Sequence, residues 1–333
     1  MQYLFIINPV AGKRDFVELL MDKIHLLQSK YPIKVVVTQH AGHAREIIDS
    51  NVETFHGSQL YIFACGGDGT LNEVINGAWK YPNVSVGCIP YGSGNDFIKS
   101  FEHFKKSDFL NIENMINGSS LPVDLLFVNN IAGINMVTAG YDCAVAKEKD
   151  TFKKLPLVSG GLAYRLSVLH CLISKLHHQF TLVADGNVIH DISNDYLFAI
   201  AANGKYYGGG YKSAPKANLC DGYIDFVRVP TLPRLKFIQL VGSFKKGYHL
   251  DDPRISFIKC MRCKKLEIKS NKTIDVNVDG EIIPMKNPVI TIKHNATRFI
   301  LPAQTSKIIE PIKDFSFKDR QMAGAVISKT SKD

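Results

Sequence analysis

The 333-residue chain lacks several features that would place a protein in a class at once. No apolar run approaches the roughly 18 to 20 residues that are needed to span a bilayer. The seven cysteines are odd in number and have no framework spacing, which favours a reducing compartment. The CxxC pair Cys260 and Cys263 has no second pair with which to form a zinc site. The N-terminal residues carry no basic segment, so we expect Tyr3–Asn8 to be a strand and not part of a secretory signal.

Strings typical of other nucleotide-binding and nucleic-acid-binding proteins are also missing. The sequence has no Walker A string, which disfavours P-loop NTPase chemistry. It has no zinc-finger spacing, RNP-like string or dense basic block, which disfavours nucleic acid as a partner. The formal net charge of +9 then suits an anionic membrane surface or a polyanionic substrate, without choosing between them.

The first third of the chain alternates apolar runs with helical patterns. We predict four strands and three helices there, at Tyr3–Asn8, Ile33–Thr38, Leu60–Ala64 and Val84–Ile89, and at Phe16–Leu27, Ala44–Asp49 and Leu71–Trp79. This alternation predicts a parallel sheet, in which ligands bind at the carboxyl ends of the strands. Glycine-bearing turns follow Asn8, Ala64 and Ile89, so we expect all three turns to meet at one site.

The character of the sequence changes near Leu121. From there to about Thr297 it consists mostly of short β-rich runs between turn residues, which predicts an antiparallel β-sandwich. Two helices interrupt it, one with an apolar seam over Leu162–Leu176 and a weaker one over Leu235–Phe244. The fold class is therefore α/β plus β, with an N-terminal domain at 1–120, a sandwich domain at 121–297 and a polar tail at 316–333.

The stretch Cys65–Gly77 holds the strongest chemical signal. Three glycines within four residues follow a buried strand, and Thr70 with Glu73 fits an N-terminal capping box for the next helix. A strand, a glycine turn and a helix N-terminus build a site for anions. Asp68 lies inside that turn and would repel a phosphate unless a cation lies between them. The stretch therefore indicates a nucleotide-phosphate and Mg²⁺ site.

The string GGDGTLNEVINGA in this stretch resembles the signature of the diacylglycerol kinase and sphingosine kinase superfamily of lipid kinases. The shorter GGDG is shared with NAD kinases and 6-phosphofructokinases, whereas the continuation TLNEVING is more specific. The resemblance extends from Asn8 to about Pro302. It implies a Rossmann-like nucleotide domain that the chain completes at about 298–315, after the sandwich.

The resemblance also implies where ATP binds. Asn8–Gly12 is similar to the family's NPxxG turn, and Gly92–Asp96 is similar to its GTxND turn, with Ser93 in place of the usual threonine. Serine keeps the hydroxyl group of threonine, so the resemblance implies that Ser93 contacts the phosphates or the adenosine of ATP. The implied ATP-binding residues are Asn8, Pro9, Val10, Ala11, Gly12, Thr38, Gly66, Gly67, Asp68, Gly69, Thr70, Asn72, Glu73, Gly92, Ser93 and Asn95.

Two groups of residues are candidates for binding Mg²⁺. Asp68, Asp96 and Asp124 are expected near one phosphate site, where three carboxylates repel one another unless a divalent ion lies among them. Separately, the stretch 218–223 resembles the family's DxxDG string, which holds a structural Mg²⁺ in some bacterial members. Here Asn218 replaces the first acid, so we expect a weaker site or none, with Asp221 and the carbonyl of Tyr223 as remaining ligands.

A third string, Asn277–Glu281, ends a predicted strand in an Asp-Gly turn and could be an ordinary hairpin corner. In the resembling family a DGE string at this place carries the general base. Glu281 is therefore the candidate base, and Asp68 the second catalytic residue. The implied reaction is transfer of the γ-phosphate of ATP to a lipid hydroxyl, with diacylglycerol giving phosphatidic acid.

Two other functions stay open at this point. An NAD kinase-like phosphotransferase with a soluble substrate would keep Asp68 but would not need Glu281, and a non-catalytic regulator would bind nucleotide or lipid without turnover.

For a lipid kinase, we expect a cytoplasmic protein that associates peripherally with the anionic inner face of the membrane. The sequence leaves the oligomeric state open, with a homodimer among the alternatives.

Overall fold

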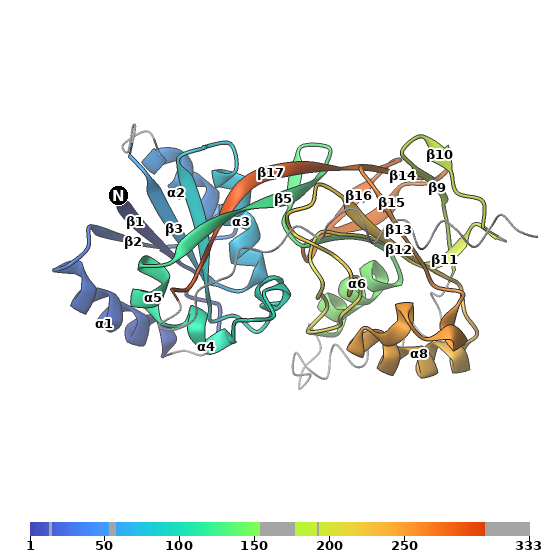
Figure 1. The fold of residues 1–333 in the computed structure, drawn as a ribbon, viewed down its shortest axis with the longest axis horizontal. Coiled ribbons are helices and arrows are strands. Elements are labelled where there is room, and N and C mark those ends of the chain that lie inside the picture. Colours follow the sequence, from blue (N-terminus) through green and yellow to red (C-terminus); the bar gives the residue numbers. More distant parts are fainter. Residues whose placement is uncertain (13–14, 53–57, 154–176, 192, 304–333) are drawn as a thin grey trace, which may run out of the picture.

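The computed structural model describes the 333-residue chain except residues 13–14, 53–57, 154–176, 192 and 304–333 (Figure 1). The predicted helix over Leu162–Leu176 and the polar tail at 316–333 lie outside the described residues. In the part of the chain that the structure describes, no helix has both the length and the apolar character needed to cross a membrane.

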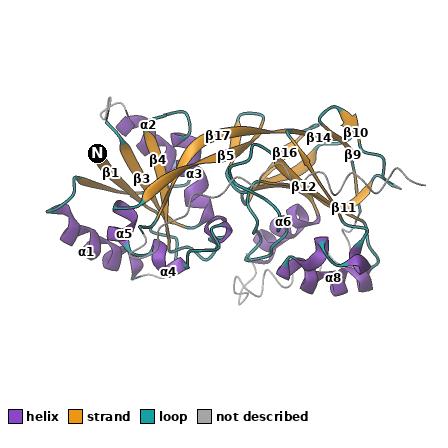
Figure 2. Cartoon of the chain, in the orientation of Figure 1, coloured by secondary structure: helices purple, strands orange, loops and turns teal. Residues whose placement is uncertain are grey.

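The N-terminal domain has the alternating architecture that the sequence predicts. Its elements are β1 (Gln2–Ile7), α1 (Phe16–Gln28), β2 (Ile33–Val37), α2 (His43–Val52), β3 (Leu60–Gly66), α3 (Asp68–Ala78), β4 (Val84–Pro90), the 3-10 helix η2 (Phe97–Ser100), α4 (Lys106–Phe109) and α5 (Ile112–Ile116). The first four strands pair in parallel in the order β4-β3-β1-β2. Right-handed crossovers in this order put α1 on one face of the sheet and α2 and α3 on the other, as Figure 2 shows.

The C-terminal domain is built mainly from antiparallel strands. Its elements are β5 (Ser119–Val128), β6 (Ile131–Gly133), β7 (Met136–Gly140), α6 (Tyr141–Lys153), β8 (His178–Gln179), β9 (Thr181–Ala184), β10 (Asn187–Val188), β11 (Asp195–Ala202), β12 (Ile224–Pro230), α8 (Arg234–Lys246), η3 (Tyr248–Leu250), η4 (Pro253–Ile255), β13 (Lys259–Cys263), β14 (Lys265–Lys269), β15 (Ile274–Val278), β16 (Glu281–Met285) and β17 (Val289–Leu301). A seven-stranded sheet in the order β13-β12-β11-β7-β15-β16, with β8 beside β11, forms one layer. The second layer continues the N-terminal sheet through β14, β9 and β10.

Strands β5 and β17 connect the two domains. They pair with each other along most of their length, and both run across the middle of the molecule in Figure 1. At its far end β17 pairs in parallel with β4, with Phe299 opposite Val86. The expected return of the chain to the N-terminal domain therefore begins inside β17. The boundary that we expected between residues 120 and 121 falls inside β5.

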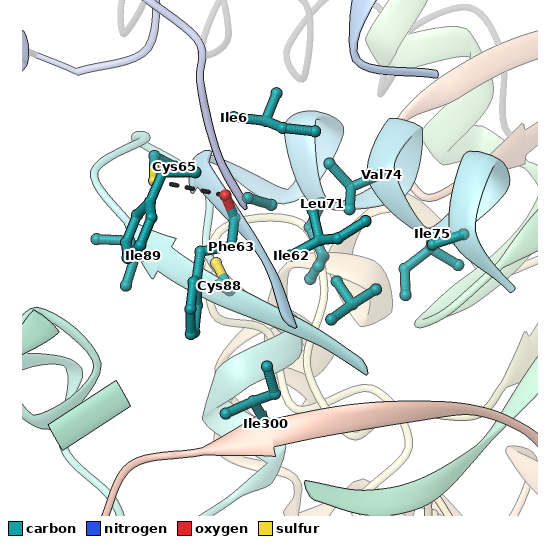
Figure 3. Packing of buried hydrophobic residues seen from close by; sticks show 14 of the residues in the cluster. Ile6, Ile62, Phe63, Cys65, Leu71, Val74, Ile75, Cys88, Ile89 and Ile300 are labelled. Carbon is teal, nitrogen blue, oxygen red and sulfur yellow. Dashed lines mark hydrogen bonds between the residues drawn. The ribbon is translucent and has the colours of Figure 1, made fainter. Parts of the chain in front are cut away.

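The core of the N-terminal domain shows why these apolar runs become central strands. All seven residues of β4 are buried, and six of seven in β3. In Figure 3, Ile62 and Phe63 of β3 and Leu71 and Val74 of α3 pack in one cluster with Ile300 of β17. The returning strand is therefore part of this core and holds the C-terminal domain against the N-terminal one.

One local expectation was wrong. Helix α3 begins at Asp68 with Gly67 as its N-cap, so Thr70 lies inside the helix and forms no capping box with Glu73. Its hydroxyl instead accepts a hydrogen bond from the side chain of Asn8, at 3.0 Å. At the start of the helix the backbone amide of Asp68 donates to the carbonyl of Gly94, at 3.0 Å, across the turn.

Candidate active site

The three glycine-bearing turns meet at the carboxyl edge of the parallel sheet, as expected. The amide of Gly92 donates to the carbonyl of Gly66 at 2.9 Å. A Cβ atom at Gly67 would lie 2.9 Å from the carbonyl oxygen of Gly94, and one at Gly12 would lie 2.7 Å from that of Tyr91. Gly12 also has a φ of +84°, which other residues rarely adopt. Glycine is needed at these positions because the turns pack directly against one another.

The first turn is fixed by Asn8. Its side chain donates to Thr70 and also accepts the amide of Val10 at 3.1 Å, while its carbonyl accepts the amide of Ala11 at 3.2 Å. Val10 is 89% exposed, which is unusual for a large apolar side chain. The turn is therefore held by polar contacts to α3 and leaves its tip open to a ligand.

Asp68 is the central carboxylate of the site. It accepts the amides of Asp96 at 2.8 Å and Phe97 at 3.3 Å. Burial raises the pKa of Asp68 to about 6, and the charges of Asp96 and Asp279 act in the same direction, against the two amides. The folded protein therefore does not fully compensate the negative charge of this carboxylate. A bound cation would compensate that charge.

Asp96 is close to Asp68 but is already paired. The residue is 5% exposed, and its carboxylate binds the ammonium of Lys99 at 2.6 Å and accepts the amide of Gly209 at 2.7 Å. Gly209 belongs to the glycine- and tyrosine-rich stretch 204–211 of the C-terminal domain. Asp96 therefore ties the two domains together beside Asp68.

Sequence reasoning missed Asp279, which precedes the candidate base. It adopts a left-handed conformation with a φ of +50°. Its carboxylate accepts the side-chain amide of Asn72 at 3.0 Å and the amides of Ile134, Asn135 and Met136 at 2.6 to 3.1 Å. Burial nevertheless raises the pKa of Asp279. The Asp-Gly pair was the available signal, since aspartate tolerates this conformation in turns.

Glu281 lies beside this turn as the first residue of β16 and is exposed. Although the residue is exposed, neighbouring protein atoms displace part of the water around its carboxyl and so raise its pKa, and the nearby charges of Glu73 and Asp279 add to that shift. A raised pKa suits a group that must take up a proton. Its neighbours Asp279 and Gly280 line the cavity described next, but Glu281 itself does not.

A cavity of about 840 Å³ lies between the turns and the C-terminal domain. Twelve of the predicted site residues line it: Asn8, Val10, Ala11, Gly12, Gly67, Asp68, Gly69, Thr70, Glu73, Gly92, Ser93 and Asp96. Among the described lining residues, four are acidic and Lys245 of α8 is the one basic side chain. Lys245 was missed because it lies in a distant part of the sequence, whereas Tyr207 and Tyr211 belong to the stretch 204–211, whose glycines and tyrosines indicate a loop near the cleft.

Other predicted residues lie outside the lining of this cavity. Among the described residues, Pro9, Thr38, Gly66, Asn72 and Asn95 do not line it. Asn72 donates to the carbonyl of Ala132 and to Asp279, and Asn95 donates to the carbonyl of Gly92 at 2.5 Å. The amide of Thr38 donates to the carbonyl of Ile7 at 2.8 Å.

Asp124 does not join Asp68 and Asp96, so the expected group of three carboxylates was wrong. Its fully buried carboxylate accepts the amides of Gly222 at 2.6 Å and Asn295 at 2.7 Å and contacts His294 at 2.9 Å. The cause is an irregularity in the β5–β17 pairing between Lys293 and Thr297, which leaves the amide of Asn295 free to bind Asp124.

The stretch 218–223 lies beside Asp124 and does not fit a metal ion. The side chain of Asn218 accepts the amide of Cys220 at 3.1 Å. Asp221 accepts the amide of Tyr223 and forms an ion pair with Arg262, whose guanidinium lies 4.7 Å from the centre of the Tyr223 ring. The guanidinium supplies the positive charge that a metal would bring. The expectation of a weaker site or none at this stretch stays a prediction.

The group of Asp68 and Asp96, by contrast, fits Mg²⁺ brought by a phosphate ligand. Within the described chain, the one set of three ligand side chains close enough to share an ion is His40, His43 and Glu46, outside this cavity. Mg²⁺ in nucleotide sites usually takes only one or two carboxylates and completes its shell with phosphate oxygens and water. The Asp68 carboxylate lies in the cavity lining with two backbone amides as its hydrogen-bond partners, an arrangement that leaves room for a cation, and its raised pKa is in line with this.

A second, apolar cavity of about 280 Å³ adjoins the first. Aromatic and aliphatic side chains of β11, α6 and α8 line it, including Phe198, Phe237, Leu240 and Phe244. Five residues line both cavities: Tyr207, Gly208, Tyr211, Asn277 and Gly280. A polar, glycine-lined cavity therefore meets an apolar one at the contact between the domains.

Comparison with known proteins identifies the family to which this two-domain chain belongs. Residues 2–128 match the family described as "Diacylglycerol kinase catalytic domain", and residues 135–301 match the "YegS C-terminal NAD kinase beta sandwich-like domain". The diacylglycerol kinase of Staphylococcus aureus (strain bovine RF122 / ET3-1) is 31% identical over 280 residues, covering 83% of this chain and 84% of the relative. The chain belongs to the diacylglycerol kinase family of lipid kinases.

Other members of the family agree with this assignment. The protein YtlR of Bacillus subtilis (strain 168) is 29% identical over 84% of this chain and 93% of its own length. The crystal structure of a diacylglycerol kinase from Bacillus anthracis str. Sterne covers 90% of this chain and 96% of that chain, with a TM-score of 0.66 and 19% identity. That structure confirms the fold, a parallel-sheet domain followed by an antiparallel β-sandwich domain.

Proposed function

We propose that this lipid kinase uses ATP and Mg²⁺ to phosphorylate a lipid hydroxyl, and that diacylglycerol is the acceptor and phosphatidic acid the product. The observation that carries the proposal is the junction of the two cavities. A triphosphate fits the glycine-opened backbone of the larger cavity, and the acyl part of a lipid fits the apolar smaller one. The relatives named diacylglycerol kinase support this choice of substrate.

The residues then have distinct roles in the proposed reaction. Glu281 accepts the proton of the lipid hydroxyl, whose oxygen attacks the γ-phosphorus while ADP leaves. The amides of the three turns hold the phosphates. Mg²⁺ bound near Asp68 and Asp96 would screen the phosphate charges. Lys245 lies on the C-terminal side of the cavity and adds positive charge there.

The apolar cavity argues for a lipid over the soluble substrate of an NAD kinase-like enzyme, although the second domain is named for its likeness to NAD kinase. A lipid substrate also requires access to a bilayer. We propose that the enzyme works in the cytoplasm at the anionic inner face of the membrane, in line with its net charge of +9.

Transfer of labelled phosphate from ATP to a panel of lipid alcohols in mixed micelles, with NAD included, tests the function. We expect label in phosphatidic acid and none in NADP. Glu281→Gln should lower kcat by about 10² to 10⁴ with little change in the KM for ATP, because it removes only proton acceptance. The control is Glu267→Gln, since Glu267 pairs with Lys265 away from both cavities. Label in NADP with full activity of the Glu281 variant would favour the NAD kinase-like alternative.

A further inference from the structure

The larger cavity contains one cation whose ligand the proposed reaction leaves undefined. Lys245 lies in the last turn of α8 and is exposed. It shares the lining of this cavity with four acidic residues. Its ammonium forms no ion pair with any of the described carboxylates, and Asp96 pairs with Lys99 instead. An ammonium that faces a cavity without a partner is available to an anionic ligand, and lysine commonly binds phosphates in this way.

The position of Lys245 is fixed by the way its helix ends. The helix stops at Gly247, which adopts a left-handed conformation with a φ of +80°. The amide of Lys212 donates to the carbonyl of Lys245 at 3.2 Å, and the ammonium of Lys212 pairs with Glu102 of the N-terminal domain at 2.6 Å. The last turn of α8 is therefore connected through Lys212 to the domain that carries the glycine turns.

A second contact locates the ammonium of Lys245 at the junction of the two cavities. It lies 5.9 Å from the centre of the Tyr211 ring, and Tyr211 lines both the larger cavity and the apolar one. In the proposed reaction the lipid hydroxyl approaches from the apolar cavity. The γ-phosphate of ATP must face that hydroxyl, because it is the group that is transferred. We therefore expect the γ-phosphate and the ammonium of Lys245 at the same junction.

A purely structural role for Lys245 would be to stabilise the end of its helix. Cations in the last turn interact favourably with the helix dipole, and Lys246 is placed in the same turn and is also exposed. Lys246, however, lines neither of the two cavities. The helix therefore offers two adjacent cations with the same structural role, of which one faces the ligand site.

We propose that the ammonium of Lys245 binds the γ-phosphate of ATP through its non-bridging oxygens, so that the C-terminal domain contacts ATP but not ADP. This inference rests on the proposed function, since it takes the larger cavity as the nucleotide site and the apolar one as the lipid site. The ammonium has three donors on a flexible stem, so it can follow the phosphoryl group from ADP to the lipid oxygen. Lys245 keeps its protons throughout the transfer.

Isothermal titration with MgATP and with MgADP, in the absence of lipid, tests the inference. We expect Lys245→Met to raise the Kd for MgATP about tenfold, the loss expected for a hydrogen bond to a charged group, and to leave the Kd for MgADP unchanged. The matched control, Lys246→Met, should leave both Kd values unchanged. Equal losses of affinity for MgATP and MgADP in Lys245→Met, or equal Kd values for MgATP in the two variants, would overturn the inference.

A chemical measurement on the unaltered protein does not depend on any variant. Exposed lysines are acetylated with N-hydroxysuccinimidyl acetate at saturating MgATP or MgADP, without lipid, and the rate at each lysine is followed by mass spectrometry. We expect MgATP to slow the acetylation of Lys245 several-fold relative to MgADP, with equal rates at Lys246. This result would support the contact even if no lipid were phosphorylated. Equal rates at Lys245 with the two nucleotides would overturn the inference alone, whereas a protein that bound neither nucleotide would overturn the proposed function as well.

Discussion

Two carboxylate clusters lie where the domains meet, and they differ in how their charge is compensated. The first cluster is Asp68 with Asp96 and Asp279, at the glycine turns. The second is Asp124 with Asp221, beneath β5 and β17. In the second cluster Asp124 has two amides and His294, and Asp221 has Arg262. In the first, Asp68 has two amides, no described cation of its own, and a pKa raised to about 6.

This difference separates a structural role from a ligand-binding one. Where protein groups already compensate the negative charge of the carboxylates, a further cation adds no stabilisation. Where they do not, a ligand that brings positive charge binds favourably. Residues of both clusters were candidates for binding Mg²⁺, but Asp68, Asp96 and Asp279 line the larger cavity, whereas Asp124 and Asp221 line neither of the two cavities described above. The predictions below test this contrast, beginning with the largest effect.

The largest expected effect follows from replacing Asp68. Asp68→Asn removes the charge that would hold Mg²⁺ near the phosphates, and we expect kcat to fall by about a hundred- to a thousandfold. Phosphate transfer to dioctanoylglycerol at saturating MgATP measures it. Asp221→Asn is the control from the other cluster and should stay within about twofold of the parent. Similar losses in both variants would remove the contrast between the clusters.

The pH dependence of nucleotide binding should report the same group. Asp68 must be ionised to bind a cation, and its pKa in the free protein is about 6. The affinity for MgATP should therefore fall about tenfold between pH 7 and pH 5, as expected for one proton taken up with this pKa. Isothermal titration at saturating Mg²⁺ measures the change, and Asp68→Asn should show a flatter profile. Equal slopes for the two proteins would assign the proton to another group.

Asp68 should also influence stability with a defined sign. Its folded pKa lies above the ordinary value for aspartate, so ionisation is harder in the folded state. The free energy of unfolding is therefore lowered as the pH rises from about 4 to about 6, and stays lower above that. Asp68→Asn should accordingly be at least as stable as the parent at pH 7 and lose that advantage at pH 4. Thermal unfolding at the two pH values checks this.

The sequence predicted the fold and the glycine turns well, since both depend on local signals. Apolar runs bounded by glycine specify β3 and β4, and GGDG followed by TLNEVING identifies the turn. The sequence could not show that Asp124 faces Asn295, because these residues are 171 positions apart and their contact depends on an irregularity in the pairing of β5 and β17. It could not show that Lys245 lines the larger cavity either, since this depends on how α8 and the stretch 204–211 pack beside the glycine turns.

Replacing Asp124 should affect stability and leave catalysis unchanged. Asp124→Asn weakens contacts to Gly222, His294 and Asn295 in a fully buried position, and we expect a loss of about 1 to 3 kcal/mol in the free energy of unfolding. Chemical denaturation measures this loss. The KM for ATP of the folded protein should not change, because Asp124 is not among the described residues that line the larger cavity. A raised KM for ATP would return Asp124 to the phosphate site.

The smallest expected effect concerns the second cluster and asks whether Arg262 takes the place of a metal. In the parent, Mg²⁺ without nucleotide should leave the unfolding of the C-terminal domain unchanged, because the guanidinium already pairs with Asp221. Arg262→Met removes that charge and leaves the carboxylate with the amide of Tyr223. Millimolar Mg²⁺ should then stabilise the variant by about 0.4 kcal/mol, as expected for a ligand at a concentration near its dissociation constant. Equal stabilisation of the parent would show that Asp221 binds the ion despite Arg262, and that the Asn218 replacement did not abolish this site.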